Sequence, residues 1–266
     1  MLLPATKIRF LTMTTITTAT TLKKLSSVSV VFPAYNEELN IENTVLKAIK
    51  VFSKYFEEVE VIPVNDGSSD KTGEIIDRLQ KEHKEVHPIH HPQNKGYGGA
   101  VKSGLFGGKN DYIFFSDSDG QFDLEEVSLL LPLIKDNDIA IGFRAHRADP
   151  WHRKLNAFCW GTLVKLLFGI KAKDIDCAFK LFKREVIDSV TLESNGAMVS
   201  TELLAQAGLM KFKLAQVGVS HYPRQAGEQT GANPWVILKA FIELFKLYGK
   251  LKHSTPAPKK AGAQNQ

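Results

Sequence analysis

Cysteine is scarce in this sequence, whose 266 residues include only Cys159 and Cys177. The two are not spaced as Cys-x-x-Cys, so the sequence offers neither a disulfide framework nor the four ligands of a structural zinc site. This cysteine usage fits a reducing compartment, and we expect a cytoplasmic location. The sequence also lacks an uninterrupted apolar run of about 18 residues, so it predicts no membrane-spanning helix.

Excess charge is missing from most of the chain. The net charge is +5, and six of the 34 basic residues but only one of the 29 acidic residues lie from Pro234 onward. The first 233 residues are therefore balanced in charge, and the basic character belongs to the C-terminus instead of a nucleic-acid-binding face. We expect no nucleic-acid partner.

The two ends of the chain differ in composition from the middle. The first 25 residues are rich in threonine and contain no acidic residue. We predict a disordered leader over residues 1–26, with a targeting segment as the alternative. Residues 254–266 are mainly Pro, Ala, Lys and Gln and are predicted to be a disordered basic tail. The remainder is long enough for one large α/β domain, predicted over 27–232.

Strand and helix patterns alternate from residue 27 to residue 115. β-branched or apolar runs typical of strands are followed each time by a polar loop and then by apolar residues at helical spacing. The predicted strands are 27–32, 59–64, 86–90 and 112–115, and the predicted helices cover 41–52, roughly 71–82 and the residues that follow 94–100. This alternation predicts an α/β fold with a mostly parallel central sheet, right-handed crossovers and flanking helices.

Two carboxylates, Asp117 and Asp119, directly follow the fourth predicted strand. In an extended chain they point to the same side, because strand side chains repeat every two residues. Two carboxylates so close repel each other unless a cation lies between them. Hard oxygen ligands favour Mg²⁺ or Mn²⁺, which in turn favours a phosphate-bearing ligand. The alternative is a solvated turn, since Asp, Ser and Gly are common in turns.

Position in the predicted sheet supports a ligand site. Ligands of such sheets bind at the carboxyl ends of the strands, where Asp66, Asn94, Asp117 and Asp119 all fall. The glycines of residues 96–99 are not spaced as G-x-G-x-x-G and follow the third strand, so we exclude a nicotinamide cofactor. They permit either a close backbone approach to a ligand or helix packing.

The second half of the chain opens with a basic stretch over 144–154 and a helix over 155–168 that is apolar on most of its surface. Such a helix is buried or touches lipid. We predict an acid-headed strand over 174–182, a helix from residue 200 and a strand over 214–222. The loop that follows places Arg224 beside glycines and hydroxyls, which suits a phosphate group, although a solvated loop is the alternative.

The last predicted element is an amphipathic helix over 233–253. Its polar residues recur in steps of four, three and four, at Lys239, Glu243, Lys246 and Lys250. They leave aromatic and aliphatic side chains on the rest of the helix surface. A helix of this kind can lie in a membrane interface, here through residues 234–250, with the following lysines attracted to anionic lipid. Docking on its own domain or on a partner is the alternative.

Four motifs in this order resemble those of family 2 inverting glycosyltransferases of the GT-A fold. They occupy residues 31–37, 64–70, 94–96 and 117–121, and the resemblance extends over roughly 28–190. Within that family the chain is similar to the group of dolichol-phosphate mannosyltransferases and polyprenyl-phosphate glycosyltransferases, through residues 142–144, 167–169, 174–184 and 221–224. It departs from that group at Phe143, where serine is usual, and over 176–180, where Ser-Gly-Phe-Arg is more frequent.

The resemblance implies roles for individual residues. Donor-binding residues would be Pro33, Tyr35, Glu37, Asp66, Asn94, Lys95, Asp117 and Ser118. A divalent metal, Mg²⁺ or Mn²⁺, would be held against the donor diphosphate by Asp117, Asp119 and Gln121. The acceptor phosphate would meet Arg144, Arg147 and Arg224. The predicted catalytic residues are Asp119, Asp174 and Arg144, with Asp174, or less favourably Asp176, as the base if the acceptor is an alcohol.

The resemblance implies a peripheral membrane enzyme that moves mannose or glucose, with inversion, from a GDP- or UDP-sugar to a polyprenyl phosphate of the dolichyl type. Such an acceptor is already an anionic nucleophile, so it needs cationic positioning more than a strong base. Two alternatives stay open. One is a transferase that acts on a soluble sugar or glycan acceptor, and the other is a non-catalytic subunit that binds nucleotide sugars.

Overall fold

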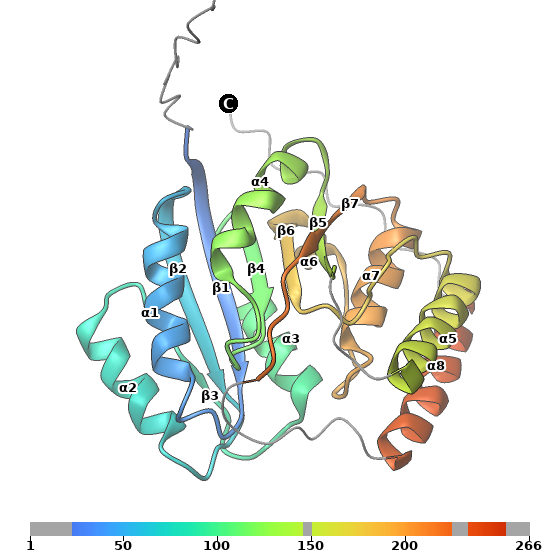
Figure 1. Cartoon of the computed structure of the whole chain (residues 1–266), viewed down its shortest axis with the longest axis horizontal. Coiled ribbons are helices and arrows are strands. Elements are labelled where there is room, and N and C mark those ends of the chain that lie inside the picture. The colour runs from blue at the N-terminus through green and yellow to red at the C-terminus, as the bar shows by residue number, and fades with distance from the viewer. Residues whose placement is uncertain (1–22, 146–150, 225–233, 254–266) are drawn as a thin grey trace, which may run out of the picture.

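The computed structural model describes residues 23–145, 151–224 and 234–253 of the chain, with side chains for 23–145, 160–224 and 242–251 (Figure 1). The predicted basic tail, residues 1–22 of the predicted leader and Arg147 lie outside the described residues. The first strand begins at Leu25, so it includes the last two residues of the segment predicted as leader.

The centre of the fold is a seven-stranded sheet in the order β3-β2-β1-β4-β6-β5-β7. Its strands are β1 (Leu25–Ala34), β2 (Phe56–Asn65), β3 (Ile89–His90), β4 (Tyr112–Ser116), β5 (Ile139–Arg144), β6 (Phe179–Lys183) and β7 (Leu214–Val219). Neighbouring strands are parallel except β6, which runs antiparallel to both β4 and β5. The prediction of a mostly parallel sheet is confirmed.

Helices cover both faces of this sheet. They are α1 (Ile41–Phe52), α2 (Thr72–Glu82), α3 (Tyr97–Gly107), α4 (Val127–Asp136), which follows the short 3-10 helix η1 (Leu124–Glu126), α5 (Trp151–Phe168), α6 (Arg184–Ser189), α7 (Val199–Leu209) and α8 (Pro234–His253). In Figure 1, α1 and α4 lie in front of the sheet and α3 lies behind it. Beyond α7, α5 contacts both α7 and α8.

The burial pattern explains why these segments were recognisable. The side chains of Val30, Val31 and Phe32 in β1 are all fully buried, because β1 lies between β2 and β4 with helices on both faces. In α1 the apolar residues at helical spacing, such as Ile41 and Val45, face the core. Burying each such side chain contributes about 1.5–3 kcal/mol to stability.

Two strand predictions in the second half of the chain had wrong boundaries. β6 begins at Phe179 instead of 174, because Asp174 binds Arg144 and accepts a hydrogen bond from the backbone N–H of Cys177 in a turn before the strand. β7 ends at Val219 instead of 222. The residues after it leave β5 and pair with the loop after β4, where Tyr222 donates its N–H to the Gln121 carbonyl at 2.8 Å.

The described half of α8 docks on the rest of the domain. Leu244 and Leu247 are buried, and the ring of Tyr248 packs edge-on against Phe168 of α5 at 5.8 Å between centroids. Lys250 forms an ion pair with Glu193 at the surface, and Lys246 is also exposed, so these two residues of the expected charged stripe face solvent. The outward surface keeps Ile242 and Phe245, 50% and 56% exposed. Neither α5 nor α8, nor any other helix among the described residues, is both long and apolar enough to cross a bilayer.

Candidate functional site

A cavity of about 750 Å³ lies at the carboxyl ends of β1, β2 and β4. It is lined by Pro33, Ala34, Tyr35, Asn36, Glu37, Asp66, Asn94, Gly96, Tyr97, Ala100, Asp117, Ser118, Asp119 and Arg224. Seven of the eight residues predicted to bind a donor are in this lining. The eighth, Lys95, contributes its backbone N–H, which donates to Asp66 at 2.9 Å. The parallel strands therefore bring together residues that the sequence separates by more than 80 positions.

Asp117 lies at the end of β4 and accepts a hydrogen bond from the hydroxyl of Tyr97 at 2.9 Å. Burial raises the pKa of Asp117 to about 7, and the neighbouring Asp119 adds to the rise, while the Tyr97 hydroxyl opposes it. Negative charge here is therefore incompletely balanced by the described residues. Tyr97 was missed in the sequence, where the segment attracted notice only for its glycines.

Asp119 receives a backbone hydrogen bond and lies near one counter-charge, which only partly offset its burial. Its Oδ1 accepts the backbone N–H of Gln121 at 3.1 Å, and the nearest Arg224 nitrogen is 3.9 Å from Oδ2. Burial raises the pKa of Asp119 despite these contacts. The side-chain amide of Gln121 donates to the carbonyl of Tyr222 at 2.8 Å. Two of the three predicted metal ligands thus line the cavity, whereas the third is engaged with the segment after β7.

The carboxylate pair fits a divalent cation chemically. Hard, anionic oxygens are the ligands that Mg²⁺ and Mn²⁺ prefer, and a cation would relieve the burial cost that raises both pKa values. In the part of the chain that the structure describes, no cluster of three or more His, Cys, Asp or Glu side chains is placed to hold a metal. A cation at this pair would therefore need further oxygen ligands from elsewhere.

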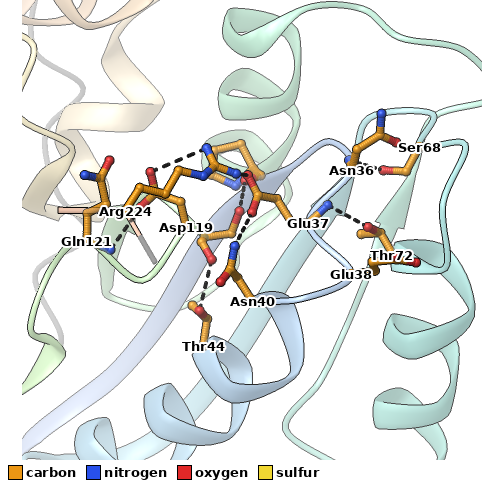
Figure 2. A network of polar contacts seen from close by, with 12 residues as sticks. Asn36, Glu37, Glu38, Asn40, Thr44, Ser68, Thr72, Asp119, Gln121 and Arg224 are labelled. Carbon is orange, nitrogen blue, oxygen red and sulfur yellow. Dashed lines mark hydrogen bonds and ion pairs between the residues drawn. The ribbon is translucent and has the colours of Figure 1, made fainter. Parts of the chain in front are cut away.

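Arg224 crosses from the segment after β7 to the loop after β1 (Figure 2). Its Nη2 donates to Glu37 Oε1 at 2.6 Å, and Asn40 holds the other oxygen of Glu37 at 2.8 Å. The same cluster includes Thr44 of α1, whose hydroxyl donates to the Ser118 carbonyl at 3.0 Å. Arg224, predicted for an acceptor phosphate, lies in the cavity that contains the predicted donor residues.

Arg144, at the end of β5, is clamped by Asp174 from the turn before β6. Nε and Nη2 of Arg144 donate to the two oxygens of Asp174 at 2.6 and 2.8 Å, a bidentate pair. Burial lowers the pKa of Arg144, but the bonds to Asp174 outweigh it and raise the pKa overall. Neither residue lines the 750 Å³ cavity. Arg144 still acts on that cavity electrostatically, because its charge lowers the pKa of Asp117.

A buried lysine lies next to these acids. Lys180 of β6 is 1% exposed, and its Nζ donates to the carbonyl of Cys177 at 2.5 Å and to Ser200 Oγ at 3.3 Å. Burial lowers the pKa of Lys180, and nearby acids that include Asp174 and Asp117 oppose the shift. A single lysine carries no sequence pattern, and Lys180 was read only as part of a motif.

Asp66, at the end of β2, is 2% exposed and is hydrogen-bonded to a histidine that does not line the cavity. Its Oδ1 lies 2.6 Å from Nδ1 of His91, and Nε2 of His91 lies 2.8 Å from Oγ of Ser103 on α3. No motif in the sequence pointed to His91. The available signal was its position directly after the short strand β3, at the sheet edge where the other site residues lie.

Comparison with known proteins gives a consistent family. The family model for glycosyl transferase family 2 matches residues 29–191. The chain is 31% identical to glycosyltransferase AglD of Haloferax volcanii over 207 residues, 74% of this chain and 33% of that protein. It is 30% identical to a dolichyl-phosphate beta-glucosyltransferase of Saccharomyces cerevisiae over 221 residues, 73% of this chain and 66% of the relative. The chain thus spans a third and about two thirds of these two relatives.

A third relative, polyprenol monophosphomannose synthase of Mycolicibacterium smegmatis, is 28% identical over 77% of this chain and 81% of its own length. Among solved structures, the chain resembles glucosyl-3-phosphoglycerate synthase of Mycobacterium tuberculosis in complex with Mn²⁺ and UDP-glucose. The TM-score is 0.64 at 18% identity, over 84% of this chain and 79% of that one. This likeness confirms the predicted fold class, a GT-A arrangement of helices around a mostly parallel sheet.

Proposed function

Because the chain belongs to glycosyl transferase family 2, we propose that it transfers a hexose from a nucleotide sugar to a polyprenyl phosphate. The observation that carries the proposal is the pair Asp117 and Asp119, whose charge is incompletely balanced at the end of a large cavity. The guanidinium group of Arg144 lowers the pKa of Asp117, and that of Arg224 lowers the pKa of Asp119. Acids that favour a cation beside arginines that favour phosphate suit a diphosphate donor and a phosphate acceptor.

The donor would occupy the 750 Å³ cavity. Asp66 follows β2, which β1 separates from β4 in the sheet, and Asn94 follows β3, which lies beyond β2. Both residues are therefore on the side of the cavity away from Asp117 and Asp119. The nucleoside would therefore bind near Asp66, with its diphosphate directed to Asp117 and Asp119. UDP-glucose is the nucleotide sugar named for the mycobacterial structure of the same fold. We assign the donor to the GDP- or UDP-sugars, with glucose or mannose as the sugar.

A divalent metal would be held by Asp117 and Asp119, with Gln121 as the third protein ligand once its amide releases Tyr222. Bound there, Mg²⁺ or Mn²⁺ would supply Lewis-acid stabilisation of the negative charge that develops on the departing diphosphate. Mn²⁺ is the metal named for the structural neighbour. The protein's own contribution is to orient the two carboxylates, which Tyr97 and the Gln121 backbone do through the hydrogen bonds described above.

Two relatives support the choice of acceptor: the yeast relative is a dolichyl-phosphate beta-glucosyltransferase, and the mycobacterial relative is a polyprenol monophosphomannose synthase. In a single displacement with inversion, an acceptor phosphate oxygen would form the new bond to the anomeric carbon. The bond from that carbon to the donor diphosphate would break, and the nucleoside diphosphate would leave with both electrons. Arg144, Arg147 and Arg224 would orient the two phosphate groups.

Asp174 would serve this reaction by holding Arg144. Both of its oxygens accept from the guanidinium, and a carboxylate so engaged is a poor base. A phosphate acceptor needs no base, so the pairing of Asp174 with Arg144 would not slow its reaction. An alcohol acceptor would need one, and Asp174 would first have to leave Arg144.

We place the reaction at a membrane surface. Ile242 and Phe245 of α8 and Leu166 of α5 are large apolar side chains that are half to four-fifths exposed on two helices in mutual contact. Exposed lysines, Lys165 and Lys246, accompany them on the same helices. Apolar side chains interspersed with lysine suit a surface of anionic lipid, which is where a polyprenyl phosphate is found.

The test is transfer itself. The full chain is incubated with a panel of labelled nucleotide sugars, Mg²⁺ or Mn²⁺, and short polyprenyl phosphates, and the organic-extractable label is counted. We expect label from one GDP- or UDP-sugar, and its loss in Asp119→Ala. The matched control is Asp77→Ala, which removes an exposed acid of α2 that pairs with His90 and lines neither the donor cavity nor the cavity next to it. Full activity in Asp119→Ala would contradict the proposal.

A soluble sugar acceptor is the second candidate, favoured by a polar cavity of about 440 Å³ that shares Asp119 with the donor cavity. Asn40, Asn43 and Lys47 line it, and amides of this kind suit hydroxyl groups. In the same assay this acceptor class would leave the label in the aqueous phase as a new glycoside. Binding of a nucleotide sugar without transfer to either acceptor would indicate a non-catalytic subunit.

A further inference from the structure

Asp66 is held by a chain of hydrogen bonds that runs away from the cavity. A carboxylate only accepts hydrogen bonds, so the 2.6 Å contact between Oδ1 and His91 requires that Nδ1 of the histidine carries the proton. Oδ1 also accepts the backbone N–H of Lys95 at 2.9 Å. The side chains of Asp66 and His91 are each 3% exposed, so both contacts are shielded from water.

This chain of hydrogen bonds ends at Ser103 of α3, whose Oγ lies 2.8 Å from Nε2 of His91. Aspartate, histidine and serine in this order also occur in hydrolases with a serine nucleophile. Here the cavity lining includes Asp66 but neither His91 nor Ser103, so the carboxylate is the end that meets a ligand. The arrangement therefore serves to hold the acid in place.

Holding Oδ1 leaves a defined group for the ligand. Among the described residues, none donates a hydrogen bond to Oδ2 of Asp66, and Asp66 lines the proposed donor cavity. With both of these donors on Oδ1, the other oxygen of the carboxylate offers a ligand only lone pairs. The ligand group that meets Oδ2 must then present a hydrogen-bond donor, which on the edge of a nucleobase is an N–H. Uracil and guanine carry such an N–H on the ring, whereas cytosine and adenine offer a lone pair at the corresponding ring nitrogen.

We infer that His91 is a positioning residue for donor selection, which fixes Asp66 as an acceptor-only group that admits uracil or guanine nucleotides and disfavours those of cytosine and adenine. This inference rests on the proposed function for the identity of the ligand as a nucleotide. A buried histidine that only stabilised the fold would give the same burial and the same 2.6 Å contact. The two roles differ in what happens to base selectivity when the histidine is replaced.

The experiment measures binding by calorimetry of UDP, GDP, CDP and ADP with Mn²⁺ to the full chain and its variants. His91→Phe keeps a ring and removes both nitrogens. His91→Asn keeps one N–H near the position of Nδ1. His87→Asn is the matched control at an exposed histidine. Donor KM and kcat are recorded for each variant that transfers sugar, with the melting temperature as a measure of folding.

For the wild type we expect UDP or GDP to bind at least about tenfold more tightly than CDP and ADP, the effect of one buried charged hydrogen bond. His91→Phe should weaken the preferred nucleotide about tenfold, with little change for CDP, and should raise donor KM while kcat stays within about twofold. His91→Asn should recover most of the selectivity, and His87→Asn should match the wild type.

Unchanged selectivity in both His91 variants, with only a lower melting temperature, would overturn the role of His91. A wild type that prefers CDP or ADP would overturn the inference of an acceptor-only group. Failure of the wild type to bind any of the four nucleotides would instead contradict the proposed function. The outcomes for the two claims are thus separate.

Discussion

Arg224 forms an ion pair at 2.6 Å with Glu37, a residue 187 positions earlier in the chain, within the cavity that ends at Asp119. Glu37 raises the pKa of Asp119 and Arg224 lowers it, so the two residues act on the same carboxylate with opposite sign. The pair connects the segment after β7 to the loop after β1. It also brings a cation to the place where the proposed donor carries its diphosphate.

Arg224→Ala should therefore lower transfer and raise the pKa of Asp119 further, because Glu37 would remain without its counter-charge. We expect kcat/KM to fall by about tenfold or more, the effect of losing a charge-assisted contact to phosphate. Glu37→Gln should lower the pKa of Asp119 instead. Steady-state kinetics over a series of pH values, with Mn²⁺ below saturation, checks this, and equal effects of the two substitutions on the pH profile would contradict it.

Asp117 predicts a pH dependence of stability in the protein stripped of divalent ions. Its pKa in the folded protein is about 7, against an ordinary value of 3.8, so the folded state holds a proton that the unfolded state releases between these pH values. Stability should fall as pH rises from about 4 to 7, and level off above, by on the order of 1 kcal/mol per pH unit. Asp117→Asn should lack this decline and be more stable than the wild type at pH 8.

Urea unfolding in EDTA over pH 4–8 makes the measurement. Asp123→Asn is the control of opposite sign, since Lys47 lowers the pKa of Asp123 and that acid contributes stability above its ordinary pKa. Parallel stability curves for the wild type and Asp117→Asn would show that the acids at the end of β4 are not under electrostatic stress.

The bidentate pair between Arg144 and Asp174 predicts that activity depends on the planar guanidinium of Arg144 more than on its positive charge. Arg144→Lys keeps the charge but cannot form the bidentate pair, and Asp174→Asn weakens the same pair from the other side. Both should lower kcat/KM for the acceptor by about tenfold or more, and the double variant should be little worse than either single one. If Asp174 were a general base, Asp174→Asn alone would abolish the reaction and Arg144→Lys would be mild.

The exposed apolar side chains of α8 predict binding to vesicles. Ile242→Asp with Phe245→Asp should release the protein from phosphatidylserine-containing vesicles, because each substitution places a charge where an apolar side chain would enter the interface. Leu129→Asp on α4, at a leucine that is 40% exposed, is the control and should leave binding unchanged. Co-sedimentation of the wild type, the double variant and the control with these vesicles makes the measurement. Equal binding of all three would show that Ile242 and Phe245 do not contact the membrane.

The first half of the fold and its site could be predicted because the signals there are local. Buried strands such as β1 and amphipathic helices such as α1 have patterns that a short window contains. The topology rule for parallel sheets then predicts that Asp66, Asp117 and Asp119 lie at one edge, and in the structure all three line one cavity.

Other features depend on contacts between distant segments. Nothing local shows that Asp174 turns back to Arg144, which is why the strand of β6 was predicted five residues too early. His91, Tyr97 and Lys180 are single residues whose roles arise only from the partners that the fold supplies. The pattern of α8 likewise defines an apolar surface without specifying which part of it the domain covers.

The most direct test of the account is the binding of Mn²⁺ to the full chain in the presence of UDP or GDP, followed by electron paramagnetic resonance. We expect one bound ion per chain that depends on the nucleotide, and loss of that ion in Asp117→Asn and in Asp119→Asn but not in Asp123→Asn. Undiminished, nucleotide-dependent Mn²⁺ binding in both Asp117→Asn and Asp119→Asn would contradict it.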